Sequence, residues 1–112
     1  MKLDRNIAEN EGRGKYAVVK MRALAQIVKE NGRMPDALRD ALAALEAVGV
    51  LDYGAAGTVD EFFLIRLKDE FSTPALRAYA FAAEDYDFEY ASEVRDMARR
   101  SGKYSEFCKK PD

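Results

Sequence analysis

The sequence predicts an α+β fold: a single small domain, mostly helical, with about four helices and one β-hairpin. Three observations predict it. Apolar residues recur at helical spacing in four segments of the chain. One segment between them alternates as strands do and follows a glycine-rich turn. The chain has 112 residues, of which 48% are apolar, which is enough for the core of one domain.

We expect three regions along the chain. Residues 1–14 show little periodicity and include "ENEGRG", which predicts an extended N-terminal arm. Residues 15–103 would form the single globular domain. Residues 104–112 would form a C-terminal tail, with Tyr104 and Phe107 as its candidate anchors.

The first helix is predicted over residues 15–31, with one apolar face made by Val18, Met21, Ala25 and Val28. Gly32 is a suitable residue to end it. Because Val18 and Val19 are β-branched, a strand over residues 16–21 stays open as an alternative.

The second helix is predicted over residues 35–48. Pro35 stands where a helix begins, and Gly49 stands where one ends. The apolar stripe between them consists of Leu38, Ala41, Leu42, Leu45 and Val48. The short link "NGRMP" predicts that the first two helices pack antiparallel.

The β-hairpin is predicted from a short strand over residues 50–53, a turn over 54–57 and a second strand over 58–68. In "EFFLIRLKD", one face of the second strand would press on the helices through Phe63, Ile65 and Leu67. The other face ends in Arg66 and Lys68, which would reach water or form a basic wing tip.

The last two helices carry the clearest boundary signals. Ser72 or Thr73 is expected to cap the third helix, with Pro74 at its first position. Its stripe consists of Leu76, Tyr79, Ala80 and Ala83. The last helix is expected to begin at residue 87 or 88 and to end near Gly102, with a stripe of Tyr90, Ala91, Val94, Met97 and Ala98.

The composition limits the kinds of catalysis and metal binding that the chain can support. The chain has no histidine and one cysteine, Cys108, so it lacks imidazole catalysis, imidazole metal ligands and an internal disulfide. We therefore expect no cofactor, no metal and no enzymatic activity. No apolar run approaches the roughly 20 residues that span a bilayer, and the N-terminus does not resemble a signal peptide. These features predict a cytoplasmic protein.

Charge gives candidate anion contacts but no strong footprint for duplex nucleic acid. The net charge is −2, with basic ends and an acidic middle. "GRGK" places Arg13 and Lys15 before a predicted helix, and Arg66 and Lys68 end the predicted strand. These four residues are candidate anion contacts. The alternative is that "GRGK" is a flexible hinge and that the strand end is a solvated surface.

The segment "EDYDFEYASE" is the candidate partner-binding surface, because acids and aromatics alternate along it. Aromatic side chains surrounded by charge are typical anchors of protein interfaces. The proposed binding residues are Glu84, Asp85, Tyr86, Asp87, Phe88 and Glu89. In the alternative interpretation, Tyr86 and Phe88 fill the junction between the last two helices.

Two other functions remain as alternatives. Two helices followed by a hairpin are typical of a winged-helix nucleic-acid-binding module, although acids on the would-be reading helix repel phosphate. The second alternative is a carboxylate enzyme. Adjacent acids, as in Asp60–Glu61, Asp69–Glu70 and Glu84–Asp85, could bind a metal or act as acid and base, but they are more typical of helix ends and solvated surfaces.

The strings "DRN", "GRGKYA", "GVLDYG", "EFFLIRLKD", "PALRAYA" and "CKKPD" together resemble short uncharacterised proteins of tailed phages and prophages. The resemblance implies a phage accessory protein in the host cytoplasm. Such a protein would bind a host protein stoichiometrically, for example in a defence or regulatory complex. It assigns a role to no individual residue, and it leaves the partner and the oligomeric state open.

Overall fold

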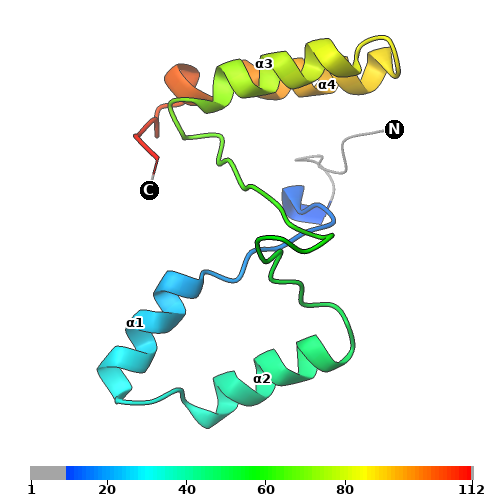
Figure 1. Cartoon of the computed structure of the whole chain (residues 1–112). Coiled ribbons are helices and arrows are strands. Elements are labelled where there is room, and N and C mark those ends of the chain that lie inside the picture. The colour runs from blue at the N-terminus through cyan, green and yellow to red at the C-terminus, as the bar shows by residue number, and fades with distance from the viewer. Residues whose placement is uncertain (1–9, 112) are drawn as a thin grey trace. The chain divides into compact units, whose positions relative to one another are not determined.

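The computed structural model describes residues 10–111. Within that range the regular elements are η1 (Asn10–Gly12), α1 (Met21–Asn31), α2 (Asp36–Ala47), α3 (Ser72–Ala83), α4 (Phe88–Ala98) and η2 (Gly102–Tyr104) (Figure 1). The described residues divide into two compact units. Unit 1 contains residues 10–17 and 64–111, and unit 2 contains residues 18–63. Most of the expected N-terminal arm, residues 1–9, lies outside the described residues.

The α+β prediction is wrong. Between residues 10 and 111 there are four α-helices and no β-strand, and the backbone bridge between Asp69 and Lys109 is an isolated pair. The predicted strands over 50–53 and 58–68 are irregular chain. The described part of the protein is therefore helical.

Local hydrogen bonds explain why the hairpin does not form. The Gly54 amide donates to Asp52 Oδ1 at 2.8 Å, and the Gly57 amide donates to Glu61 Oε1 at 2.8 Å. The Thr58 hydroxyl donates to the Ala55 carbonyl at 2.6 Å. Side chains of this kind offer the backbone an alternative to strand pairing. The backbone of this segment therefore forms short local turns. A strand is stabilised by hydrogen bonds to a neighbouring strand, and these turns leave no second strand for it to pair with.

The predicted alternation of buried and exposed side chains in "EFFLIRLKD" is also wrong. Phe63 was expected in the core, yet it is 88% exposed, and its neighbours Phe62 and Leu64 are exposed too. Among the apolar residues of the segment, only Leu67, near its end, is half-buried. Period-two burial requires a pleated sheet, so it disappears together with the hairpin.

The first helix begins later than predicted. Residues 15–20 are not helical, and α1 begins at Met21 after Lys20, whose backbone is extended. The β-branched pair Val18–Val19 lies in this non-helical stretch, but no strand forms there, so the strand alternative for residues 16–21 is also wrong. The end was predicted correctly, because Gly32 ends α1 with a left-handed φ of 77°.

The second helix matches its prediction closely. It spans Asp36–Ala47 after Pro35, and Gly49 follows it with a φ of 78°. The Val50 amide donates to the Leu45 carbonyl at 3.1 Å, as expected for a glycine-terminated helix. Neither α1 nor α2 contains a buried residue, and the two helices diverge from their link, so the expected antiparallel packing is not observed (Figure 1).

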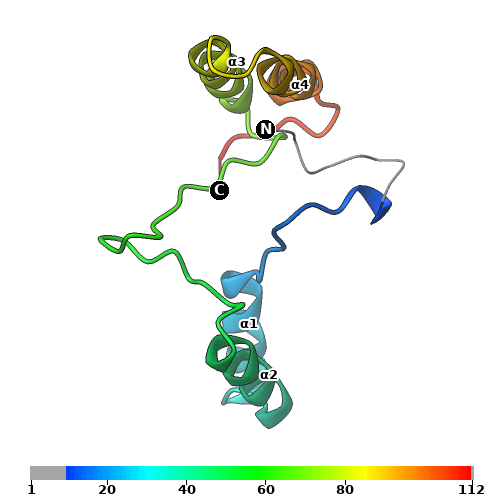
Figure 2. The ribbon, with the colours of Figure 1, turned by 90° about the vertical axis from the view of Figure 1, so that its right-hand side faces the viewer.

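The best-packed part of the chain is the hairpin of α3 and α4 in unit 1. The two helices lie side by side in both views (Figures 1 and 2). The buried contact is made by small side chains of the predicted stripes, namely Ala80, Ala91, Val94 and Ala98. Leu76, Ala83 and Tyr90 pack at its edge. Small residues let the helices approach closely, but they bury little apolar area.

The predicted cap of α3 is wrong in detail. Ser72 is the first helical residue and Phe71 precedes it, without a side-chain cap. The Ser72 hydroxyl instead donates to the carbonyls of Leu67 and Asp69, at 2.8 and 2.7 Å. Pro74 lies two residues after the start of α3 and not at its first position as predicted, and it is tolerated there because amides throughout the first helical turn have no partner within the helix.

A hydroxyl network joins the start of α3 to the end of α4, and we call this region the joint. The Thr73 hydroxyl donates to the Ser101 carbonyl at 2.9 Å, and the Ser101 hydroxyl donates to the Ala98 carbonyl at 2.6 Å. The buried Gly102 donates its amide to the Leu67 carbonyl at 2.6 Å. Lys109 extends the joint, since its amide donates to Lys68 and its carbonyl accepts from Glu70, both at 2.9 Å.

Replacing Gly102 tests the joint. A Cβ there would lie 2.4 Å from Thr73 Oγ1 and 3.3 Å from the Glu70 carbonyl oxygen, at a left-handed φ of 50°. Gly102→Ala should reduce the free energy of unfolding by about 2–4 kcal/mol, from backbone strain and steric overlap together. Urea unfolding followed by helical circular dichroism measures this loss.

Thr73→Ala provides the partner variant for a double-mutant cycle. Removing Oγ1 relieves the closest overlap, so Gly102→Ala with Thr73→Ala should cost less than the sum of the single variants. Strict additivity, or a cost for Gly102→Ala below about 1 kcal/mol, would contradict the described packing.

Candidate functional site

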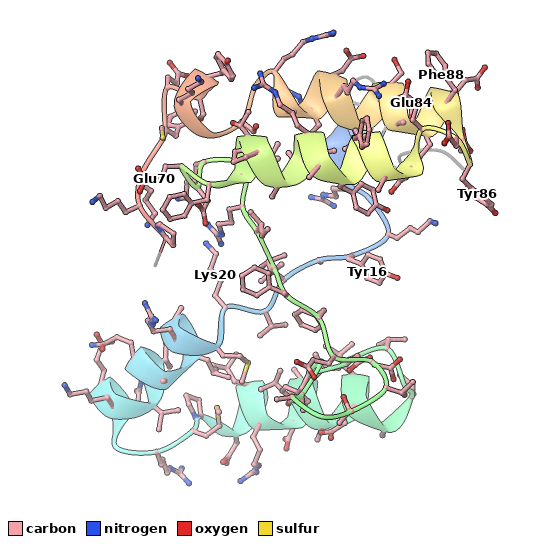
Figure 3. All side chains as sticks on the ribbon, turned by 45° about the horizontal axis from the view of Figure 1, so that its top comes forward. Tyr16, Lys20, Glu70, Glu84, Tyr86 and Phe88 are labelled. Carbon is pink, nitrogen blue, oxygen red and sulfur yellow. The ribbon has the colours of Figure 1, made fainter. Side chains whose placement is uncertain are left out.

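The turn between α3 and α4 displays two aromatic side chains. Tyr86 lies in the turn and is 81% exposed, and Phe88 begins α4 and is 64% exposed. Both project outward from the end of the hairpin (Figure 3). They therefore do not fill the junction between the helices, which was the alternative interpretation. The junction is lined instead by Ala83 and Tyr90.

Two of the candidate acids help to build the hairpin. The Asp87 side chain caps α4 and accepts a hydrogen bond from the Tyr90 amide at 3.0 Å. The Glu84 carboxylate accepts from the Arg95 guanidinium at 2.6 Å, and both side chains are partly buried. This pair links the end of α3 to the middle of α4. Glu84 and Asp87 thus position the turn.

The other two candidate acids face water. Asp85 and Glu89 are exposed, and neither forms an ion pair with another described residue. They flank Tyr86 and Phe88 in the sequence. The six predicted residues therefore divide into two that support the turn and four that are presented to solvent. An exposed arrangement of two rings and two unpaired carboxylates fits contact with a basic surface.

Sequence reasoning missed a third aromatic residue of this region. Phe81 lies near the end of α3 and is 79% exposed. A signal was available, because Phe81 falls outside the stripe of Leu76, Tyr79, Ala80 and Ala83 that was expected to face α4. A large apolar residue off the packing stripe of a helix has no partner within its own hairpin. We refer to Phe81, Tyr86 and Phe88 as the aromatic tip.

Tyr79 and Tyr90 support the hairpin beside the tip. Their hydroxyls lie 3.0 Å apart in a hydrogen bond, and their rings meet edge to face with centroids 6.1 Å apart. Each comes from a different helix. This contact bridges α3 and α4 outside the buried alanines, in a geometry that aromatic pairs favour.

The structure does not assemble the four candidate anion contacts into one site. Arg13 forms an ion pair with Glu11 at 3.1 Å, so its charge already has a partner. Arg66 is exposed and Lys68 is half-buried in the segment that leads into α3. The four residues remain a prediction without a shared geometry.

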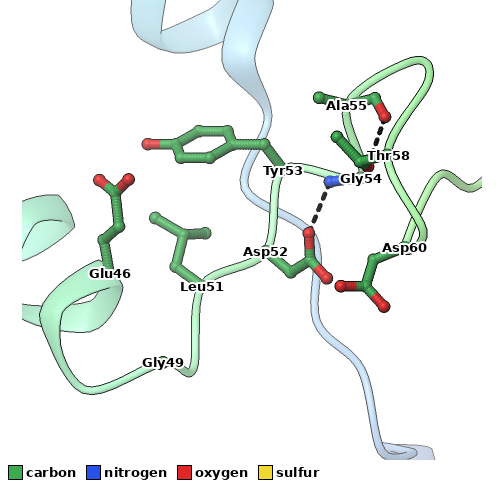
Figure 4. Close-up of a pocket in the computed structure, with 9 residues that line it drawn as sticks. All are labelled: Glu46, Gly49, Leu51, Asp52, Tyr53, Gly54, Ala55, Thr58 and Asp60. Atoms are coloured by element: carbon green, nitrogen blue, oxygen red, sulfur yellow. Dashed lines mark hydrogen bonds between the residues drawn. The ribbon is translucent and has the colours of Figure 1, made fainter.

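A surface depression of about 420 Å³ lies in unit 2 (Figure 4). It is open to solvent and is lined by Glu46, Gly49, Leu51, Asp52, Tyr53, Gly54, Ala55, Thr58 and Asp60. Its Asp52 carboxylate already accepts the Gly54 amide in the local turn. No basic residue lines it, and we assign no reaction to it.

Residues 10–111 contain no cluster of three or more histidine, cysteine, aspartate or glutamate side chains that would hold a metal ion. None of their helices is both long enough and apolar enough to cross a bilayer.

Comparison with protein-family models, with curated proteins and with solved structures gives no match for this chain.

Proposed function

We propose that this chain is a non-enzymatic binding protein whose aromatic tip docks onto a basic surface of a partner protein. The observation that carries the proposal is the exposure of Tyr86 and Phe88 on a well-packed helical hairpin. Burying each ring in a partner would remove a large apolar area from water. Few hydrogen bonds would be lost, since the backbone of the turn is already bonded within the hairpin.

Rigidity of the hairpin favours such binding. The Asp87 cap and the Glu84–Arg95 pair hold the turn from within unit 1. A preorganised surface loses less conformational freedom on association, so more of the interaction free energy appears as affinity. The exposed carboxylates of Asp85 and Glu89 would attract a basic partner and raise the association rate.

The resemblance to phage and prophage proteins favours a host protein as the partner, with binding in the host cytoplasm. A defence or regulatory complex of the host would be a suitable target for a stoichiometric inhibitor. The winged-helix alternative loses its structural basis, because residues 10–111 contain no strand that would form the wing. The carboxylate-enzyme alternative has no supporting arrangement in the open depression of unit 2.

Replacing both rings tests the proposal. Tyr86→Ala with Phe88→Ala should weaken binding of the partner by roughly 30-fold or more, because a single interface anchor is worth about 2 kcal/mol or more. The midpoint of thermal unfolding should stay nearly unchanged, since both rings are exposed. The partner is first purified from host extract with the unaltered chain, and the affinity of each variant for it is then measured.

The matched control removes one tyrosine and one phenylalanine elsewhere in unit 1. Tyr16 and Phe107 are 83% and 69% exposed, so Tyr16→Ala with Phe107→Ala removes similar apolar area from the surface. Photo-crosslinking groups in place of Tyr86 and Tyr16 give a second readout. The proposal fails if both variants bind equally well, or if position 16 crosslinks to the partner and position 86 does not.

Removing the two unpaired acids should act on the rate of association. Asp85→Asn with Glu89→Gln is expected to slow association by up to about tenfold at low salt and to change dissociation little. Stopped-flow or biosensor kinetics at two salt concentrations measure both rates. Asp60→Asn with Glu106→Gln removes the same charge elsewhere, and an equal slowing there would mean that net charge alone steers the partner.

A further inference from the structure

A second cluster of side chains lies at the joint, at the other end of the hairpin from the aromatic tip. Tyr104 of η2 accepts a hydrogen bond from Arg77 of α3, with 3.2 Å between Nη2 and Oη. The Arg77 guanidinium carbon lies 5.6 Å from the centre of the Tyr104 ring. The Lys103 ammonium lies 5.2 Å from the same centre. Two cations therefore converge on one tyrosine.

Neither cation has a carboxylate partner in the described part of the chain. Other arginines of the described residues form ion pairs with carboxylates. Arg13 pairs with Glu11, and Arg95 pairs with Glu84. Arg33, Arg39 and Arg99 are paired in the same way. Arg77 and Lys103 appear in none of these pairs. Two positive charges that both approach one tyrosine and have no carboxylate partner favour the binding of an anion.

The joint holds the cluster in place. Gly102, directly before Lys103 and Tyr104, is buried, and its amide is bonded to the Leu67 carbonyl. The Tyr104 amide donates to the Ser101 carbonyl at 2.9 Å, and Ser101 is itself bonded to Thr73. The backbone that carries two members of the cluster is therefore fixed to α3, which carries the third.

The side chains of Arg77, Lys103 and Tyr104 supply hydrogen-bond donors for an anion. The Tyr104 oxygen accepts from Arg77, which leaves its own O–H group able to donate. The guanidinium retains further N–H groups, and the ammonium has three. We propose that Arg77, Lys103 and Tyr104 form a binding site for a phosphate group, either free or as a phosphomonoester. A phosphate dianion matches the two positive charges and accepts several hydrogen bonds at once.

The acidity of Tyr104 agrees with this geometry. The hydrogen bond from Arg77, followed by the positive charges of Lys103 and Arg77, lowers the pKa of Tyr104 from its ordinary value. The site thus favours negative charge at this position. A bound phosphate would oppose ionisation of the phenol, so phosphate should raise the pKa of Tyr104 toward its usual value.

Titration of the full chain with inorganic phosphate, followed by ¹⁵N NMR, tests the site. We expect saturable shifts of the Gly102, Lys103 and Tyr104 amides and of the Arg77 side chain. Arg77→Gln with Lys103→Gln should weaken binding by about tenfold or more, because two charge-assisted hydrogen bonds are lost. Arg22→Gln with Lys29→Gln removes one arginine and one lysine from exposed positions of α1, and this control should bind as the unaltered chain does.

The ionisation of Tyr104 is a second readout. The absorbance difference between the unaltered chain and Tyr104→Phe follows this one phenol, and phosphate should move its titration to higher pH relative to chloride at equal ionic strength. Phenyl phosphate and a short DNA duplex distinguish the sources. Saturable binding of inorganic phosphate and of phenyl phosphate supports the site. Shifts that do not saturate, equal losses in both double variants, or binding of duplex in preference to phosphate would overturn it.

Discussion

The joint between the start of α3 and the end of α4 is the constraint on which the packed helical hairpin depends. The buried part of the contact between the two helices consists of alanines and one valine, which permit close approach but bury little apolar area. Because this small core buries little apolar area, hydrogen bonds at the joint provide further stabilisation of the helix pair. Thr73, Ser101 and the Gly102 amide connect the two helices at one end, and no buried side-chain polar atom in the described residues lacks a partner. The joint holds one end of the helix pair. At the opposite end, a short turn connects α3 to α4, and Asp87 caps α4 there.

Large aromatic residues of the hairpin are left in water. The closely packed alanines are lined at their edge by Leu76, Ala83 and Tyr90, and Phe81, Tyr86 and Phe88 lie outside this contact. The hairpin thereby carries different chemistry at its two ends. The turn presents rings with the exposed carboxylates of Asp85 and Glu89, and the joint presents cations around Tyr104. The proposed protein contact and the proposed phosphate site are separate surfaces of unit 1, and each can fail without the other.

Sequence patterns predicted four helices correctly, but the β-hairpin predicted over residues 50–68 is wrong. Glycines at 32 and 49 ended α1 and α2 where expected, because a left-handed residue is a local requirement that sequence shows directly. The stripes of α3 and α4 were also readable, since their spacing follows the helical period. Strand pairing is not local, and Asp52, Thr58 and Glu61 bonded to nearby backbone instead. The sequence allowed Tyr86 to be either exposed or buried between the last two helices, and it did not decide between the two. The Arg77–Tyr104 contact joins residues that are too far apart in the sequence for their spacing to predict it.

Native-state hydrogen exchange tests the central claim, that the joint closes the hairpin, most directly. The Gly102 and Lys109 amides donate to the Leu67 and Lys68 carbonyls at 2.6 and 2.9 Å. Both amides should therefore exchange as slowly as the buried Val94 amide in α4, since all three would open in the same cooperative unit. Exchange at Gly102 and Lys109 near the rate of an unstructured peptide, while Val94 stays protected, would show that the helices pair without the joint and would contradict this account.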